Sequence, residues 1–286
     1  MATLKAIRKR ITSVRNTQQI TRAMKMVAAA KLRRAQETVT RARPYADKMS
    51  DMLRNLSSRV APESHPLLKA RAEKQVDLLL LTSDRGLCGG YNAYLIRAAE
   101  AFTRERAGQV KVRLIIAGRK GSDHFRRRGA DIAERYLNLS TMMPGDLAAE
   151  LAEKTIERFL NEESDGTYLL YSRFQSALSQ VPTVEKLLPV AAGQGPEEER
   201  GIEYLLEPGV EALLSSLLPK VVEVAVFRAL LEAAASEHGA RMTAMDAATT
   251  NASEMISHLT LQMNRARQAA ITTELMEVVS TAEALR

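Results

Sequence analysis

The chain has 286 residues, a formal net charge of +7, 4% aromatic residues, no tryptophan and one cysteine. Its length is sufficient for one large or two modest domains, and no apolar run approaches the ~20 residues that a membrane-spanning helix needs. A single cysteine excludes an internal disulfide, and the scarcity of aromatic residues argues against a surface that stacks on nucleic-acid bases. The N-terminus is charged at once and lacks the apolar core of a signal peptide, so we expect a protein of the reducing cytosol.

Residues 3–58 are predicted to form one long amphipathic helix. Its inner face begins with the 3-4-3 spacing of a coiled-coil seam, at Leu4, Ile7, Ile11 and Val14. The phase of the pattern then slips, and apolar residues continue it at Ile20, Met24, Val27, Leu32, Ala35 and Val39. The slip predicts a local change in supercoiling.

The same helix is strongly basic. Residues 1–43 contain twelve Lys or Arg and one acidic residue, a net charge of +11, so we expect an anionic partner. Pro44 is expected to kink the helix, because proline removes a backbone hydrogen bond and clashes with the preceding turn. Pro62 and Pro66 mark its end and a linker.

The middle of the chain is predicted to be a Rossmann-like α/β domain. Short apolar runs of the kind found in buried parallel strands occupy 76–82, 112–117 and 168–171, and 132–137 is a weaker strand candidate. Helical stretches lie near 92–106 and 146–162. Residues 193–200 are predicted to be a loop, and Ile202–Leu206 an edge strand. Alternating strands and helices of this size favour a parallel sheet flanked by helices.

The first strand is followed by a glycine-rich segment, SDRGLCGGYN at 83–92, where a phosphate loop would lie. Its glycines match neither dinucleotide-binding nor P-loop spacing, and no Lys-Ser/Thr follows to hold phosphate and magnesium. We therefore interpret Gly86, Cys88, Gly89 and Gly90 as a structural turn, with Cys88 a small thiol and no nucleophile.

Other candidate sites have little support. The four histidines, at 65, 124, 238 and 258, lack metal-ligand spacing, and no carboxylate pair stands out. Arg126–Arg128 is interpreted as a solvated surface or a helix end. We therefore expect no catalytic residue, metal or cofactor in this chain.

A second long helix is predicted over residues 209–285. A regular 3-4 seam runs through Met242, Met245, Thr249, Ala252, Ile256, Leu259, Met263, Ala266, Ala270 and Thr273. Pro219 suggests a kink or a fresh start. From Lys220 onward the helix would be a rod of about 100 Å. The two end helices are expected to pair as an antiparallel hairpin, giving an α+β fold with residues 1–60 and 209–286 as coiled coil and residues 75–206 as the α/β domain.

Four segments resemble the gamma subunit of F-type rotary ATP synthase, in the family's order and over essentially the whole chain. They are ITRAMKMVAAAKL at 20–32, SDRGLCGG at 83–90, RMTAMDAATTNA at 241–252 and NRARQAAITTEL at 264–275. The chain departs from the family where Met263 replaces an aromatic residue and where Ser280-Thr281 replaces a Gly-rich end. The cysteine pair of the redox-regulated chloroplast relatives is missing, which favours a bacterial origin.

The resemblance implies a torque-transmitting central shaft without an active site. It implies one copy of this chain per three alpha and three beta subunits, with catalysis on the beta subunits, and further contacts with the epsilon subunit and the membrane rotor ring of c subunits. Proton flow would turn the rotor ring. Nucleic acid would not be a partner, and the chain would be peripheral, on the cytoplasmic side of the bacterial inner membrane.

The resemblance also implies which residues contact the beta subunits. In the family, basic and polar shaft residues face acidic catch segments, and the matching positions here are Met24, Lys25, Arg241, Arg267, Gln268, Thr272 and Glu274. Arginine suits such pairs, because its planar guanidinium binds two carboxylate oxygens. The largely apolar tip, residues 278–285, would turn in an apolar sleeve.

Two other functions are compatible with the residues alone. A nucleotide-dependent enzyme would use the central sheet and keep the helices as oligomerisation arms; tight ATP binding by the isolated chain would favour it. A basic coiled-coil adaptor would bind nucleic acid or a membrane surface, with an affinity that falls steeply with salt.

Overall fold

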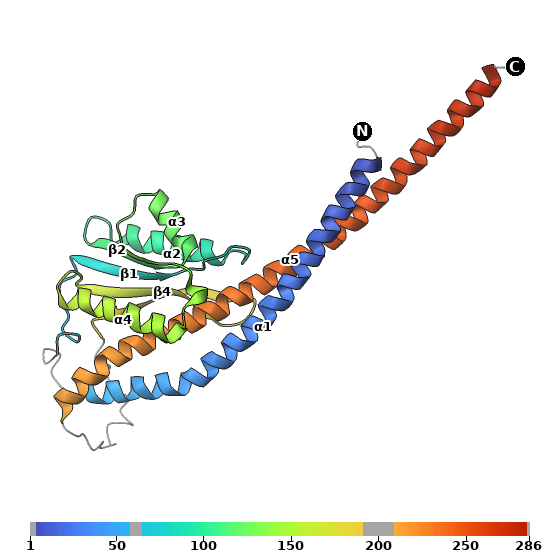
Figure 1. Ribbon diagram of the computed structural model, residues 1–286. Coiled ribbons are helices and arrows are strands. Elements are labelled where there is room, and N and C mark those ends of the chain that lie inside the picture. The colour runs from blue at the N-terminus through green and yellow to red at the C-terminus, as the bar shows by residue number, and fades with distance from the viewer. Residues whose placement is uncertain (1–3, 58–64, 191–208, 285–286) are drawn as a thin grey trace. The chain divides into compact units, whose positions relative to one another are not determined.

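A computed structural model describes residues 4–57, 65–190 and 209–284 (Figure 1). Two long helices, α1 (Leu4–Ser57) and α5 (Val210–Ala284), enclose in sequence an α/β segment. By their internal contacts the residues form two compact units. One joins the start of α1, to Ala28, with the end of α5, from Met242; the other runs from Ala29 to Arg241. The division into three segments by sequence stays a prediction.

The larger unit contains a five-stranded sheet in the order β3-β2-β1-β4-β5. The strands are β1 (Gln75–Leu81), β2 (Lys111–Ala117), β3 (Ile132–Tyr136), β4 (Gly166–Phe174) and β5 (Gln180–Leu188). The first four are parallel, and β5 is antiparallel to β4. The remaining helices are α2 (Tyr91–Glu105), α3 (Arg119–Arg127), α4 (Pro144–Leu160) and a 3-10 turn, η2 (Leu139–Thr141). This arrangement confirms the predicted α+β fold class.

Helices cover both faces of the sheet (Figure 1). Leu78 and Leu80 of β1 pack with Leu95 of α2 on one face, and Leu79 packs with Leu151 of α4 and with α5 on the other. Side chains alternate between the two faces of a strand, and both faces are covered here, so every residue of β1 after Gln75 is buried. This double burial explains why the strand is a nearly continuous apolar run in the sequence.

The predicted strands at 76–82, 112–117, 132–137 and 168–171 and the helices at 92–106 and 146–162 are confirmed, with small shifts in their ends. The sequence did not predict β5 and α3. In β5, burial is irregular and Pro182 interrupts the run, as befits an edge strand. Helix α3 has nine mostly charged residues, and the arginine run 126–128 lies exposed at its end, as expected. The expected strand Ile202–Leu206 lies outside the described residues.

The smaller unit is an antiparallel helix pair. Thr21 faces Thr249 and Lys25 faces Asp246, so facing positions rise along α1 as they fall along α5. The predicted phase slip is wrong: Ile20 and Val27 are 60% and 57% exposed, and Thr21 is buried. An unbroken heptad spacing instead continues through 7, 11, 14, 18, 21, 25 and 28. The seam keeps its phase by accepting polar residues.

Prolines do not end either long helix. Helix α1 continues through Pro44, and α5 continues through Pro219 from its start at Val210, so a fresh helix start at Pro219 is wrong. The predicted kink at Pro44 stays a prediction.

Candidate functional site

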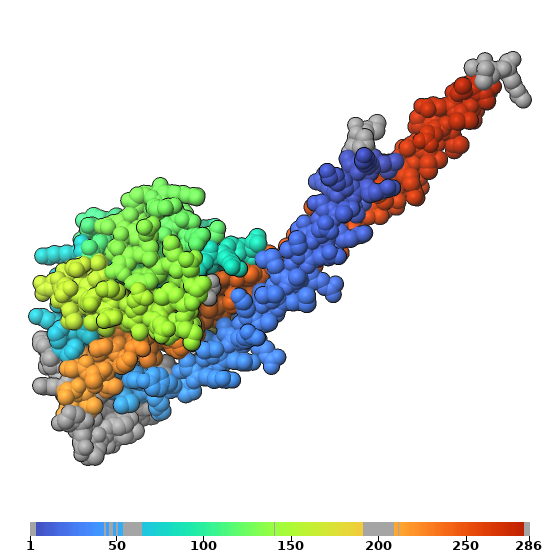
Figure 2. Space-filling view, in the orientation of Figure 1, coloured from blue at the N-terminus to red at the C-terminus, as the bar shows by residue number. Residues whose placement is uncertain are grey.

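The end of α5 carries four of the predicted contact residues, Arg267, Gln268, Thr272 and Glu274, and all are exposed. Figure 2 shows these last turns of α5 (red) continuing past the start of α1 (blue). Glu274 follows Arg267 by two helical turns, so both lie on one side of the helix. Among the described residues, neither has an ion-pair partner. Exposed Ile271 lies between them, so this face presents both charge and apolar surface.

Two predicted contact residues on α1 differ in environment. Met24 is half-buried beside the seam. Lys25 is held by α5: its Nζ lies 2.5 Å from Asp246 Oδ1, with the two side chains 41% and 56% exposed. Lys25 therefore already has a partner within the helix pair.

Arg241, the remaining predicted contact, is bound inside the larger unit. Its Nη2 lies 2.7 Å from Glu237 Oε1 and also reaches the carbonyl of Gly86 at 3.3 Å. Its Nη1 lies 3.2 Å from His238 Nδ1. The Arg241 side chain is only 12% exposed. It therefore attaches α5 to the glycine-rich turn.

Burial shapes the electrostatics around Arg241. Loss of solvent raises the pKa of Glu237, although the nearby Arg241 guanidinium opposes this rise. Burial, together with the smaller effects of the Arg241 and Lys31 charges, lowers the pKa of His238 to about 4. His238 is therefore neutral at physiological pH, so its Nδ1 can accept a hydrogen bond from Arg241.

The segment 83–92 is a turn held by its own side chains. Asn92 accepts a hydrogen bond from the Ser83 backbone N–H at 3.0 Å and donates to Ser83 Oγ at 2.8 Å and Cys88 Sγ at 3.2 Å. Burial raises the pKa of the Cys88 thiol, which makes it a poor nucleophile. The Tyr91 hydroxyl donates to the Ala233 carbonyl of α5 at 3.2 Å. The turn thus connects the sheet to α5.

The anion position at the start of α3 is occupied by the chain itself. Asp84 Oδ1 accepts the backbone N–H groups of Arg119, the first residue of α3, and of Asn138, both at 3.1 Å. A phosphate would need such free N–H groups at a helix N-terminus. Gly118 precedes them at φ 107°, where an added Cβ would lie 2.2 Å from the Thr82 carbonyl oxygen. The region beyond the carboxyl ends of β1 and β2 is therefore closed by contacts within the chain.

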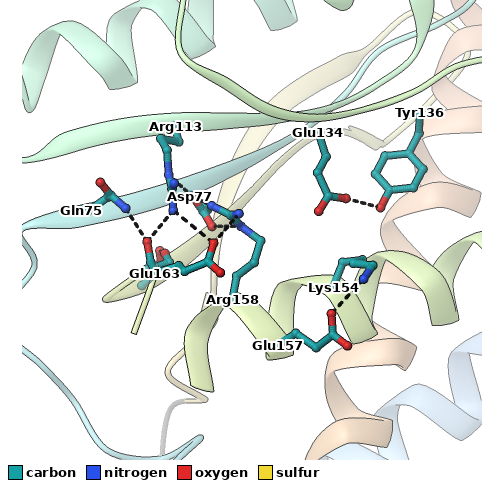
Figure 3. A network of polar contacts seen from close by, with 11 residues as sticks. Gln75, Asp77, Arg113, Glu134, Tyr136, Lys154, Glu157, Arg158 and Glu163 are labelled. Atoms are coloured by element: carbon teal, nitrogen blue, oxygen red, sulfur yellow. Dashed lines mark hydrogen bonds and ion pairs between the residues drawn. The ribbon is translucent and has the colours of Figure 1, made fainter. Parts of the chain in front are cut away.

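A largely buried ion network lies near the amino ends of β1 and β2 (Figure 3). Asp77 of β1 is fully buried and accepts from Arg158 Nε at 2.8 Å and Nη2 at 3.2 Å. Arg113, its register partner on β2, lies 3.5 Å away and donates to the Glu163 carbonyl at 2.5 Å. Arg158 also bonds Glu163 Oε2 at 2.9 Å. The network joins β1, β2 and α4 and has a structural role.

No cluster of His, Cys, Asp or Glu among the described residues is suited to hold a metal ion. None of the helices searched, which cover the described residues only, is long and apolar enough to cross a bilayer.

Four acidic residues that hold the contacts above were not predicted from the sequence: Asp246, Glu237, Asp84 and Asp77. A signal existed for two of them. Asp77 is a lone charge inside an apolar strand, which demands a buried partner. Asp246 flanks the seam opposite a lysine, the usual arrangement of interhelical ion pairs. Glu237 and Asp84 meet partners that the linear pattern of the sequence does not reveal.

Residues 3–285 match the protein family described as ATP synthase. The ATP synthase gamma chains of Geobacter metallireducens and Moorella thermoacetica are 52% and 50% identical over 287 residues, covering all of both chains. The chain belongs to the gamma-subunit family of F-type ATP synthase. This gamma subunit is therefore part of an enzyme complex and forms the central shaft of a rotary motor that makes ATP.

Solved structures agree with this assignment. A chain in the central stalk and c-ring structure of Tetrahymena thermophila mitochondrial ATP synthase matches with a TM-score of 0.63 and 29% identity, over 80% of this gamma subunit and 99% of that chain. A chain in the OSCP/F1/c-ring structure of the Euglena gracilis mitochondrial enzyme matches with a TM-score of 0.71, over 99% and 94%. At 21% identity, the second match supports the fold alone.

Proposed function

We propose that this gamma subunit turns as one copy inside a ring of three alpha and three beta subunits and changes the conformation of each beta subunit in turn. Catalysis takes place on the beta subunits. The observation that carries this proposal is the exposed end of α5, where charged, polar and apolar side chains share one face and the charged ones lack ion-pair partners among the described residues. A surface of this kind fits an enclosing protein partner.

The contacts with beta are made by Arg267, Gln268, Thr272 and Glu274, with Met24 on α1. Arg267 suits a bidentate pair with an acidic segment of beta. Lys25 and Arg241 have partners within this chain, so their contribution is to position the contact face. The shaft's orientation then favours one of two conformations of each beta subunit.

The larger unit holds the epsilon subunit and the membrane rotor ring of c subunits, so that ion flow through the membrane turns the shaft. The gamma subunit lies on the cytoplasmic side of the bacterial inner membrane and meets the membrane only through the complex. The close relationship to bacterial gamma chains supports this location.

Co-expression with the alpha and beta subunits of the same organism tests the proposal. We expect a complex with one gamma subunit per three alpha–beta pairs, and ATP hydrolysis that collapses without it. R267A/Q268A should lower torque-coupled hydrolysis about tenfold or more, because removing a hydrogen bond to a charged group weakens the interface between gamma and beta by roughly 1.5–3 kcal/mol.

The matched control removes two exposed polar side chains earlier on α5, in S253A/E254A, and should hydrolyse ATP as the original does. Equal activity of both variants would contradict the proposed contact face. A gamma subunit that stays out of the complex would contradict the shaft proposal itself.

A further inference from the structure

The seam of the helix pair in the smaller unit changes from apolar to polar side chains along its length. Ile7 and Ile11 of α1 pack against Leu259 of α5, with further apolar neighbours around them. The seam then changes character. Thr21 Oγ1 lies 2.8 Å from Thr249 Oγ1, and Lys25 pairs with Asp246 one turn further along.

Two threonine hydroxyl protons serve three hydrogen-bond contacts at this level. The Thr249 hydroxyl can donate to the Met245 carbonyl at 2.7 Å, within its own helix. If Thr249 uses its proton there, Thr21 donates across the interface; either hydroxyl can be the donor between the two helices. Thr21 can likewise donate to the Gln18 carbonyl of its own helix at 3.0 Å, and Thr249 then donates across the interface. Thr21 is 8% exposed, so its hydroxyl has little access to water.

We infer that this polar level, made of Thr21, Thr249, Lys25 and Asp246, sets the register of the two helices and keeps them from sliding past each other. These four are positioning residues, which hold the proposed contact face of α5 at a fixed height relative to α1. The inference about register rests on contacts within this chain, whereas any effect of the register on torque rests on the proposed function.

Sliding by one heptad shows why the polar level carries the register. Thr21 would then meet Met242 or Ile256, and its buried hydroxyl would lose the hydrogen bond between the helices. Asp246 would leave Lys25, which would lie level with Gly239 or Ser253.

The apolar positions of the seam distinguish the native register from a shifted one less strongly. A shift of one heptad exchanges one set of apolar side chains for another, and apolar packing depends on buried area more than on direction. Hydrogen bonds and ion pairs depend on specific partners, and a polar pair in a coiled-coil seam is known to select register.

Electron-spin distance measurements on the full chain test this inference. Nitroxide labels at T12C and S257C, two exposed positions at similar height in the native register, report any sliding. A slip of one heptad moves the labels apart by about 10 Å along the axis. We expect a single label-to-label distance in the T12C/S257C chain that carries no further substitution. In T21V/T249V/K25A/D246A we expect the slipped population to rise about tenfold, because this variant removes a buried hydrogen bond and a half-exposed ion pair.

The charge swap K25D/D246K is the matched control, because it restores the pair with reversed signs, and it should keep the single distance. K25D alone keeps both threonines and should produce a smaller second population, so it remains informative if the quadruple variant fails to fold. A single native distance in every variant would overturn the inference and assign the register to side-chain shape. A shifted register with unchanged coupling in the alpha–beta complex would contradict the proposed shaft role and leave the register inference intact.

Discussion

Replacing Arg241 with alanine separates an internal role from a partner contact. Arg241 and Glu237 form a 2.7 Å ion pair with side chains only 12% and 22% exposed, and Arg241 also reaches the Gly86 carbonyl. Removing one member of a buried pair leaves the other charge without compensation, which costs ~3–5 kcal/mol in fully buried cases. Because some solvent reaches this pair, we expect R241A to lower the free energy of unfolding by about 2–4 kcal/mol.

Urea unfolding of the full chain, followed by circular dichroism, measures this loss. Exposed Arg267 provides the control, and R267A should leave stability unchanged. The loss should also depend on pH. Burial raises the pKa of Glu237 and Arg241 holds it down, so R241A raises this pKa further. A carboxyl with a raised folded-state pKa loses its stabilising contribution as pH rises through that value, so the penalty is larger at pH 8 than at pH 5.5.

Equal stability of R241A and R267A in the isolated chain would refute this reasoning. Arg241 would then not stabilise the attachment of the turn to α5, and its role would be in contacts formed only within the complex.

Three further predictions concern the larger unit. D77A should lower the free energy of unfolding by about 3–5 kcal/mol in urea titrations, because two arginines lose a buried counter-ion, whereas E157Q on the exposed face of α4 should be neutral. His238 has a pKa of about 4, so unfolding experiments should show stability falling as pH drops from roughly 6.5 to 4, by up to ~1.4 kcal/mol per pH unit, and H238Q should remove this slope. G118A should cost about 3 kcal/mol or more in thermal unfolding, because Cβ would meet a carbonyl oxygen at positive φ, whereas G145A, with open space around it, should fold normally.

Hydrophobic periodicity predicted the sheet well and the coil less well, for a physical reason. A buried parallel strand such as β1 is apolar on both faces, so its sequence is sufficient to place it. In the seam of α1, an apolar pattern alone favoured Ile20 and Val27, which are exposed. The correct phase passes through Thr21 and Lys25, whose partners lie 228 and 221 residues away in the chain. Side chains that are acceptable in a seam only as pairs cannot be recognised from one helix of the pair.

The same limit applies to the candidate contact residues. Sequence similarity placed Lys25 and Arg241 beside Arg267 as a single class of basic residues. The structure separates them, because Lys25 and Arg241 have ion-pair partners in the chain and Arg267 is exposed without one among the described residues. Arg241 is internal because it contacts the Gly86 carbonyl, 155 residues earlier in the chain, and the partly buried Glu237. The sequence around Arg241 does not reveal these contacts.

Helix α5 passes through three environments, and its last part is incomplete in isolation. Up to residue 233 it packs on the sheet, and between residues 245 and 266 its seam packs on α1. From residue 271 to 282 every position is exposed, including Leu275, Met276, Val278 and Val279, each more than half accessible. A helical segment with so few tertiary neighbours gains little stability from its own hydrogen bonds in water, and monomeric proteins rarely expose such continuous apolar surface. The end of α5 therefore needs an enclosing partner to bury this surface, and the proposed ring of alpha and beta subunits would supply one without requiring any reaction on the gamma subunit.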